Sequence, residues 1–270
     1  MQRSIESLRH QFEVEQDLAR RLRNSSREGR TELFKTLYGE LFDRVPDHPR
    51  LTRRDTAESS AIAVRSQLNL LKPVLNPDVT LLEFAPGDCR LSKAAAQHCK
   101  QVIGVDISDQ RAPGDTFPAN FELIVYDGYH LPLADQSVDV VFSYQFLEHL
   151  HPDDVEPHFT QVSRVLKKGG AYVLDTPHRH SGPHDIARFF TTDLVCLHMK
   201  EWTYRELREL GRKHGLGTSF AYRRGRPVKY AFGNILNDTL ETLLGFLPAK
   251  LRQKASARLY GGVTIMLVKD

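Results

Sequence analysis

Apolar positions divide the chain into two parts with different patterns. In the first part they recur at helical spacing, as in the series Val64, Leu68 and Leu71. In the second part, short apolar runs alternate with amphipathic stretches, and turn residues separate them. The pattern predicts an N-terminal helical cap at residues 1–72, followed by a domain at residues 73–270 in which strands alternate with helices.

Five apolar runs in the second part predict strands. The runs are continuous rather than alternating, which is typical of parallel strands buried on both faces. They lie at residues 79–84, 101–107, 121–126, 138–144 and 171–176. Helices are predicted between them at residues 90–99 and 153–166, and this alternation indicates a Rossmann-like, doubly wound sheet.

The last quarter of the chain predicts two further strands and a helical insertion. Thr203, with Glu206 three residues later, forms a capping box that opens a helix. A sixth strand is predicted at residues 218–223, and a seventh at 262–269 after an insertion at about 224–261. We therefore expect an α/β fold with a seven-stranded sheet, mostly parallel with an antiparallel last strand.

The composition is that of a folded globular protein. Of 270 residues, 40% are hydrophobic and 26% are charged, which excludes a disordered chain. No apolar run approaches the roughly 18 residues that a membrane span requires, and the charged N-terminus has no apolar signal core. Cys89, Cys99 and Cys196 form no paired motif and suit a reducing compartment, so we expect a cytoplasmic protein.

Charge is distributed unevenly along the chain, although the net charge is only +3. Residues 1–72 carry 14 basic and 11 acidic side chains, giving +3, and residues 73–200 carry 10 and 17, giving −7. Residues 201–270 carry 13 and 6, giving +7. A solvated basic face is the commoner explanation of such a segment, and a polyanion partner is the alternative.

The ends of the first three strands have the features of a nucleotide-binding site. Gly87 lies in a tight turn where a side chain would obstruct a ligand, and the helix that follows offers free N–H groups. Asp106 ends the second strand and can accept hydrogen bonds from ribose hydroxyls. Asp127 ends the third strand and can accept a hydrogen bond from a purine amino group. The carboxyl ends of adjacent strands are where such sheets bind ligands.

In these motifs the chain resembles the class I S-adenosylmethionine-dependent methyltransferases, and within them the small-molecule subgroup that includes the ubiquinone/menaquinone-biosynthesis enzymes. The segments that carry the resemblance are residues 81–90, 105–106, 126–128, 143–150 and 166–170. The resemblance implies an enzyme with S-adenosyl-L-methionine as cofactor, Asp106 on the ribose, and Asp127 with Gly128 beside the adenine. The cofactor-binding residues that we expect are Glu83, Ala85, Gly87, Asp106, Ile107, Asp127, Gly128 and Ser143.

Two loop positions depart from that family's pattern of three alternating glycines. Ala85 and Cys89 stand at the first and third positions, so we expect weaker or reshaped cofactor binding. They also motivate an alternative in which the protein is a non-catalytic cofactor-binding adaptor. A dinucleotide dehydrogenase would need G-x-G-x-x-G, but the corresponding positions are Ala85, Gly87 and Arg90.

Histidines near the strand ends are the candidate catalytic residues. Methyl transfer to a hydroxyl is an in-line displacement that needs a base for the hydroxyl proton, and histidine suits neutral pH. We rank His178 first, His184 second and His149 third, and each has turn capping as its alternative role.

A metal site is a competing interpretation of the same segment. Its ligands would be His178, His180, His184, Asp185 and His198. Their spacing matches no compact ligand pattern. We therefore predict that the protein holds no metal and that its activity is metal-independent.

The expected acceptor is a small molecule or a glycan, and we favour O-methylation of a hydroxyl. Residues 143–146 read SYQF where DNA amine methyltransferases have Asn/Asp-Pro-Pro-aromatic, and no Pro-Cys dipeptide occurs. Glu148 lacks the second glutamate of protein arginine methyltransferases. Nucleic-acid and protein acceptors are therefore the alternatives, and a homodimer is compatible with the sequence. Arginines that could hold an anionic group on the acceptor are Arg179, Arg188, Arg223, Arg224 and Arg226.

Overall fold

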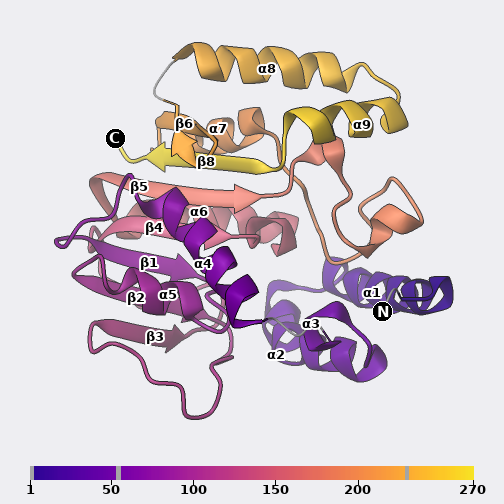
Figure 1. Cartoon of the computed structure of the whole chain (residues 1–270), viewed down its shortest axis with the longest axis horizontal. Coiled ribbons are helices and arrows are strands. Elements are labelled where there is room, and N and C mark those ends of the chain that lie inside the picture. The colour runs from indigo at the N-terminus through magenta and orange to yellow at the C-terminus, as the bar shows by residue number, and fades with distance from the viewer. Residues whose placement is uncertain (1–2, 53–55, 229–230) are drawn as a thin grey trace.

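The computed structural model describes residues 3–52, 56–228 and 231–270, and it confirms the predicted Rossmann-like α/β fold (Figure 1). The predicted cap and insertion include residues 1–2, 53–55 and 229–230, which lie outside the described residues. Within the described ranges, no helix combines the length and the apolar character that crossing a membrane requires.

One sheet with the strand order β3-β2-β1-β4-β5-β8-β6-β7 forms the centre of the fold. Its strands are β1 Thr80–Phe84, β2 Gln101–Asp106, β3 Phe121–Val125, β4 Val138–Tyr144, β5 Leu166–Thr176, β6 Thr218–Arg223, β7 Arg226–Pro227 and β8 Val263–Val268. The first five strands pair in parallel, and β8 runs antiparallel between β5 and β6, as predicted. All seven predicted strands are present. The eighth, β7, has two residues and pairs with β6 across a tight turn, so it is too short for an apolar pattern to reveal.

Nine α-helices and three short 3₁₀ helices occur among the described residues. The α-helices are α1 Ile5–Arg23, α2 Arg27–Arg44, α3 Pro49–Thr52, α4 Ala57–Leu71, α5 Arg90–Ala95, α6 Pro152–Val165, α7 Tyr204–Lys213, α8 Ala231–Gly245 and α9 Ala249–Leu259; the 3₁₀ helices are η1 Leu147–His149, η2 Arg179–Ser181 and η3 Ile186–Phe189. The predicted capping box opens α7: the Thr203 side chain accepts from the Glu206 N–H, and the Glu206 carboxylate accepts from the Thr203 N–H at 3.0 Å.

Two elements have different bounds from those predicted. Helix α5 stops at Ala95, because the Asn120 side chain donates to the carbonyl oxygens of Ala96 at 2.9 Å and Cys99 at 3.1 Å and supports a turn there. Strand β5 begins at Leu166, five residues before the predicted start, because Leu166 pairs with Val138 ahead of a register shift. The spacing of apolar residues cannot reveal a side-chain amide that comes from a distant part of the chain. It also cannot reveal a strand pairing that contains a bulge.

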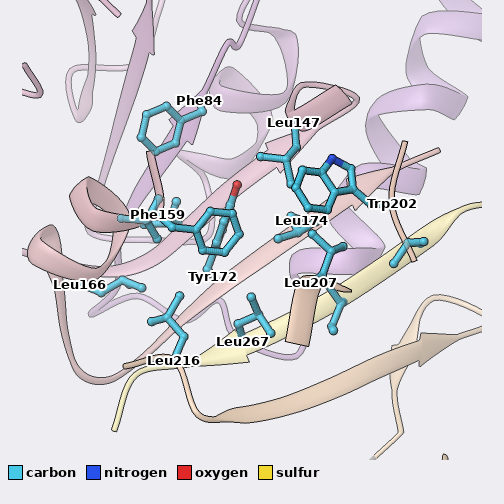
Figure 2. Packing of buried hydrophobic residues seen from close by; sticks show 14 of the residues in the cluster. Phe84, Leu147, Phe159, Leu166, Tyr172, Leu174, Trp202, Leu207, Leu216 and Leu267 are labelled. Atoms are coloured by element: carbon cyan, nitrogen blue, oxygen red, sulfur yellow. The ribbon is translucent and has the colours of Figure 1, made fainter. Parts of the chain in front are cut away.

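Side chains on the two faces of the sheet form two separate apolar clusters. Neighbouring residues of one strand point to opposite faces, so Tyr172 belongs to the cluster under α6 and α7, and Val173 belongs to the cluster under α4 and α5. Figure 2 shows the first cluster, in which the Tyr172 ring lies close to Phe159 of α6. Strands β1, β2, β4 and β5 are largely buried, in agreement with their continuous apolar runs, whereas the edge strand β3 has no buried residue, so the expected burial on both faces is wrong for β3.

Helices α1–α3 lie beyond the carboxyl ends of the parallel strands, and α1 and α2 share an apolar cluster with Leu197 and Met199 of the segment after β5 (Figure 1). Leu18 and Leu22 of α1 pack there with Leu37 and Leu41 of α2. A buried ion pair joins this cluster to the sheet domain: the Arg30 guanidinium of α2 contacts the Asp154 carboxylate of α6 at 2.7 Å. Helix α4 packs with α5 against the sheet instead, so the residues of the predicted cap fall into two groups.

Candidate cofactor and acceptor site

The loop between β1 and α5 has a repeating left-handed backbone. Ala85, Gly87 and Cys89 have φ angles of 51°, 56° and 58°. These are the three alternate positions at which the methyltransferases that the sequence resembles usually have glycine. A non-glycine residue in this region carries roughly 1–3 kcal/mol of strain, so the loop keeps its shape at the cost of strain at Ala85 and Cys89.

Gly87 and Asp106 form the floor of a cradle for a polar ligand. A Cβ atom added to Gly87 would meet nothing within 4 Å, so the space above this residue is open. The Asp106 carboxylate is 5% exposed and accepts from the N–H groups of Gly87 and Ser108, each at 3.3 Å. Burial raises the pKa of Asp106, against the effect of these hydrogen bonds. The Ile107 N–H and the Gln110 side chain also donate to this carboxylate, so a ligand bound at Asp106 would share it with these groups.

This cradle opens into a cavity of about 1240 Å³ that three parts of the chain enclose. The carboxyl ends of the strands supply Asp106 and Phe146, helices α1–α3 supply Tyr38 and Arg50, and the segment after β5 supplies His184. Single-ligand pockets measure roughly 300–1,000 Å³. The cavity therefore has room for a cofactor and a second molecule beside it.

Five of the eight predicted cofactor-binding residues line this cavity. They are Ala85, Gly87, Asp106, Ile107 and Gly128. Glu83, Asp127 and Ser143 are not among its lining residues. Glu83 is 5% exposed on β1 and accepts a hydrogen bond from the Ser92 hydroxyl of α5. Burial raises the pKa of Glu83 to about 7, and the contact fixes the start of α5 against the strand.

Asp127 and Ser143 have partners in the protein itself. The Asp127 carboxylate accepts from the N–H groups of Tyr129 at 2.8 Å and His130 at 2.7 Å. Burial opposes ionisation of Asp127, but the hydrogen bonds from His130 and Tyr129 outweigh it and lower the pKa to about 2. The Ser143 hydroxyl contacts the Tyr172 hydroxyl at 2.8 Å inside the core. Asp127, predicted to contact adenine, is therefore outside the cavity lining, whereas its neighbour Gly128 lines the cavity.

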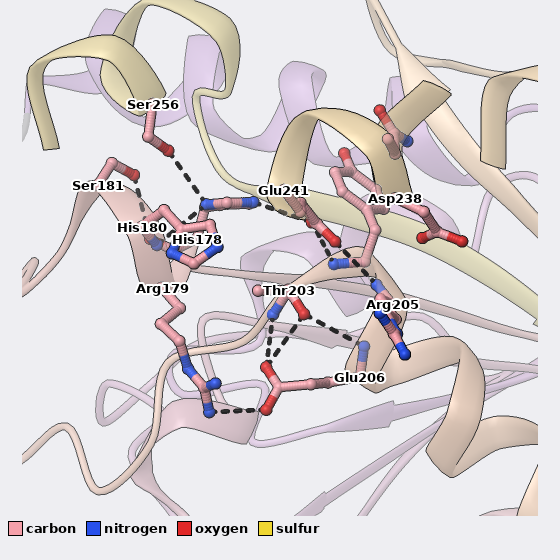
Figure 3. A network of polar contacts seen from close by, with 12 residues as sticks. His178, Arg179, His180, Ser181, Thr203, Arg205, Glu206, Asp238, Glu241 and Ser256 are labelled. Atoms are coloured by element: carbon pink, nitrogen blue, oxygen red, sulfur yellow. Dashed lines mark hydrogen bonds and ion pairs between the residues drawn. The ribbon is translucent and has the colours of Figure 1, made fainter. Parts of the chain in front are cut away.

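His178 does not line the cavity, so the expectation that its ring points into the cleft is wrong. The ring is completely buried, with Nε2 3.0 Å from the Glu241 carboxylate of α8 and Nδ1 accepting from the His180 N–H (Figure 3). It also stacks on Tyr260, with ring centroids 4.3 Å apart. The insertion returns over the end of β5 and covers this histidine. Its partner Glu241 is 63 residues away, which no local pattern shows.

His184 lines the cavity and has a carboxylate partner. Its Nδ1 lies 3.1 Å from one oxygen of Glu201, and its backbone N–H donates to the other at 2.7 Å. Burial alone would raise the pKa of Glu201, but hydrogen bonds from His184 and His198 lower it to about 2. An ionised carboxylate therefore orients the His184 ring through Nδ1, and Nε2 forms its hydrogen bond with a hydroxyl group. The Ser181 hydroxyl lies 3.2 Å from Nε2.

His149 also lines the cavity, next to His198. Its Nδ1 lies 3.1 Å from the Leu197 carbonyl oxygen, so this nitrogen carries the proton and donates. Burial, with a smaller contribution from His198, lowers the pKa of His149 to about 3. The ring is therefore neutral near pH 7 and a weak base. The two imidazoles meet edge to face, with centroids 5.0 Å apart.

The structure divides the metal set considered from the sequence into two groups. His178 and His180 lie against the insertion, whereas His184, Asp185 and His198 line the cavity. Of the five arginines proposed as anion ligands, Arg188 lines the cavity. Arg179 pairs with Glu206 instead, and Arg223 of β6, Arg224 of the turn and Arg226 of β7 lie at the far edge of the sheet.

Glu201 and Tyr38 are site residues that the sequence did not single out. Glu201 stands three residues after His198, a spacing that can bring a carboxylate to an imidazole, but it lies in an irregular segment. Tyr38 belongs to a helix whose apolar series predicts packing, and it enters the cavity because α2 lies over the strand ends. Burial raises the pKa of its hydroxyl.

Residues 82–174 match the family model of the methyltransferase domain. A protein of Mycolicibacterium smegmatis named as a probable S-adenosylmethionine-dependent methyltransferase is 39% identical over 80 residues, which are 30% of this chain and 29% of that relative. The chain thus matches less than a third of that relative's length.

Two solved structures share the fold at low sequence identity. The 1,6-didemethyltoxoflavin-N1-methyltransferase of Burkholderia thailandensis, solved with 1,6-didemethyltoxoflavin and S-adenosylhomocysteine, gives a TM-score of 0.54 at 15% identity, covering 88% of this chain and 89% of its own. A Haloferax volcanii methyltransferase complex with the Trm112 activator gives 0.51 at 18% identity, covering 79% and 94%. The match shows that residues 82–174 carry a methyltransferase domain, and the observed fold agrees with it.

Proposed function

We propose that the protein O-methylates a hydroxyl group of a small molecule or glycan, with S-adenosylmethionine as the methyl donor. The observation that carries the proposal is one continuous cavity with a cofactor cradle and an oriented histidine in its wall. Gly87 and Asp106 line the cradle, and His184, held by the Glu201 carboxylate, lines the acceptor side. Positioning two reactants in one enclosed space supplies much of the rate of such a transfer.

The described residues fit this cofactor. The buried Asp106 carboxylate lines the cavity beside Gly87 and can accept hydrogen bonds from the ribose hydroxyls, and the open backbone at Gly87 admits the amino-acid part of the ligand. When bound, the cofactor supplies a sulfonium methyl group, whose C–S bond breaks with its electron pair going to sulfur as the acceptor oxygen bonds the carbon. The neutral product, S-adenosylhomocysteine, keeps the same polar groups for Asp106.

His184 takes the hydroxyl proton in this proposal. Its Nδ1 is held by Glu201, so the proton leaving the acceptor oxygen goes to Nε2. His149 is less suited to this role, because burial keeps its pKa near 3. We therefore place His184 ahead of His149, and we withdraw His178 because of its buried position against Glu241.

The walls of the cavity favour a small acceptor. Aromatic side chains from three parts of the chain face the space: Phe34, Tyr38 and Phe42 from α2, Phe146 after β4, and Phe189 of η3. Helices α1–α3 act as a lid in this proposal, and a roofed space excludes a duplex or a folded protein. Segments 143–150 and 166–170 support the small-molecule subgroup of the ubiquinone/menaquinone type.

Cellular context and assembly are part of the same proposal. The three cysteines are buried and unpaired, which suits the reducing cytoplasm. A homodimer is supported by exposed apolar side chains on the insertion: Leu243 is 58% exposed, Phe246 82% and Leu251 58%.

The test is methyl transfer from tritium-labelled cofactor to a panel of phenols, sugars and hydroxy acids, with S-adenosylhomocysteine formation measured in parallel. The proposal expects label in an extracted small product and an equal amount of S-adenosylhomocysteine. Tight S-adenosylhomocysteine binding without transfer to any fraction of a cell extract would favour the adaptor. Label in the protein or nucleic-acid fraction would favour a macromolecular acceptor.

A further inference from the structure

We propose that Glu148, His149 and His198 bind one divalent transition-metal ion in the wall of the cavity. One ligand atom from each of these residues lies within 4.8 Å of the others. The inference rests on the proposed function only for the role of the ion, which would be to bind the hydroxyl of the acceptor. The geometry of the three residues stands independently of that role.

Backbone contacts hold the three residues together although His198 is 49 residues from His149. The Glu148 carbonyl oxygen of η1 accepts from the N–H of Met199 at 2.7 Å and of Lys200 at 3.3 Å. From the other side, the Arg23 guanidinium of α1 donates to the carbonyl oxygens of the His198 segment, including that of His198 at 3.3 Å. The segment that carries His198 is thereby fixed between η1 and α1.

Both histidines are held as metal ligands usually are. His149 Nδ1 donates to the Leu197 carbonyl oxygen at 3.1 Å, and His198 Nδ1 lies 2.9 Å from the Glu201 carboxylate. Each Nε2 therefore presents a lone pair, and neither has a hydrogen-bond partner within the described ranges. A metal-bound imidazole almost always donates its other N–H to a carbonyl or carboxylate, which fixes the tautomer and the ring.

Glu148 supplies the independent observation that points to a ligand. Its side chain is completely buried, and Oε2 accepts from the Thr176 hydroxyl at 3.0 Å. Oε1 is also buried and has no hydrogen-bond partner in the described part of the chain. A buried carboxylate oxygen without a partner is costly, and a cation beside it removes that cost. The Asp185 and Glu201 carboxylates near His198 add negative charge at the same place.

The ligand set favours a particular class of ion. Two imidazoles and one carboxylate suit first-row transition ions such as Zn²⁺, Mn²⁺, Fe²⁺ or Co²⁺, whereas Mg²⁺ and Ca²⁺ prefer oxygen ligands throughout. At metal–ligand distances of about 2.1 Å, ligand atoms stand about 3–3.4 Å apart, so the three groups, whose ligand atoms lie within 4.8 Å of one another, would have to move closer together around the ion.

An ion bound by three protein groups keeps open positions. His149 and His198 both line the cavity, so these positions face the acceptor space. Coordination there would lower the pKa of an acceptor hydroxyl and ease the loss of its proton to His184. This proposal differs from the metal-independent activity that the sequence predicts.

The experiment is a titration of the chelator-treated full chain with Co²⁺, followed by calorimetry and by visible absorption. We expect one equivalent to bind, with absorption bands of a site containing nitrogen ligands. His149→Ala and His198→Ala should each weaken binding at least about a hundredfold. His98→Ala, which removes an exposed histidine, is the matched control and should bind Co²⁺ as the wild type does.

Glu148→Gln provides a second test if an alanine variant fails to fold, because it keeps the shape of the side chain and loses its charge. Absence of saturable one-to-one binding, or unchanged affinity in folded variants of the cluster, would overturn the site. Affinity for S-adenosylhomocysteine and methyl transfer are measured on the same samples. Co²⁺ binding without any methyl transfer would support the metal site and reject the proposed function. Full methyl transfer in the presence of chelator, without Co²⁺ binding, would support the proposed function and reject the metal site.

Discussion

The two sides of the cavity are built in different ways. The cofactor side consists of strand ends and the turns that follow them, so Gly87 and Asp106 lie near each other because β1 and β2 are paired neighbours. The acceptor side is assembled from distant segments, with Tyr38 from α2 and His184 from the irregular region after β5. A domain of this kind can therefore keep its cofactor site while its acceptor site changes with the added segments.

Loss of His184 is expected to give the largest effect, which is on turnover. The same variant tests whether the acceptor side and the cofactor side of the cavity act independently. His184→Ala should lower turnover by roughly 10²–10⁴-fold, because the acceptor proton loses its base. Affinity for S-adenosylhomocysteine should change less than about threefold, since His184 contacts none of the cradle residues. Turnover and calorimetry on this variant, with Glu201→Gln as a second variant and His98→Ala as control, check the prediction. A parallel fall of turnover and affinity would mean that the two sides are not separable.

The buried Arg30–Asp154 pair tests how the lid is held on the domain. Both side chains are less than a tenth exposed, so Arg30→Ala leaves the Asp154 carboxylate buried without its partner. We expect a loss of about 3 kcal/mol in the free energy of unfolding. Denaturant unfolding measures it, and Arg21→Ala is the matched control, because its pair with Glu40 is exposed and worth at most about 1 kcal/mol. Equal losses in the two variants would contradict the account.

Glu83, on the cofactor side, predicts that the stability of the protein depends on pH. Its pKa is raised from 4.5 to about 7, so the folded state holds a proton that the unfolded state has released. The resulting stabilisation is complete below about pH 4.5 and is lost as the pH rises through 7. Glu83→Gln should therefore gain stability relative to the wild type over that window, by about 3 kcal/mol at pH 8. Unfolding curves from pH 4 to 8 test this. The exposed Glu122→Gln should show no such trend.

Relief of backbone strain in the loop between β1 and α5 is expected to have the smallest effect, which is on the stability of the folded protein. Ala85 has a φ of 51°, which glycine adopts without steric cost. Ala85→Gly should therefore raise the melting temperature slightly, by an amount equivalent to about 0.5–1 kcal/mol. The same substitution at Ala61, an exposed position of α4, should lower stability by about 1 kcal/mol. Destabilisation by both substitutions would mean that the loop is not strained at Ala85.

The same contrast explains what could be predicted from the sequence. Strands buried on both faces have continuous apolar runs, and Asp106 follows from its place at the end of such a run. The Glu201–His184 contact could not be predicted in the same way, because it joins residues of an irregular segment that carries no periodicity. His178 was misplaced because Glu241 and Tyr260 reach it from the insertion. Local sequence patterns predict helices and strands and the residues at their ends. The acceptor side could not be predicted in this way, because it depends on tertiary contacts between distant segments.

The most direct test of the central claim is calorimetry with S-adenosylhomocysteine on Asp106→Ala and His184→Ala, measured beside the wild type. The account predicts a roughly ten- to hundredfold loss of affinity for Asp106→Ala, because a charged hydrogen-bond acceptor of the ribose is removed. It predicts wild-type affinity for His184→Ala. Unchanged affinity in Asp106→Ala would contradict the account, because the cofactor would then bind somewhere other than the cradle formed by Gly87 and Asp106.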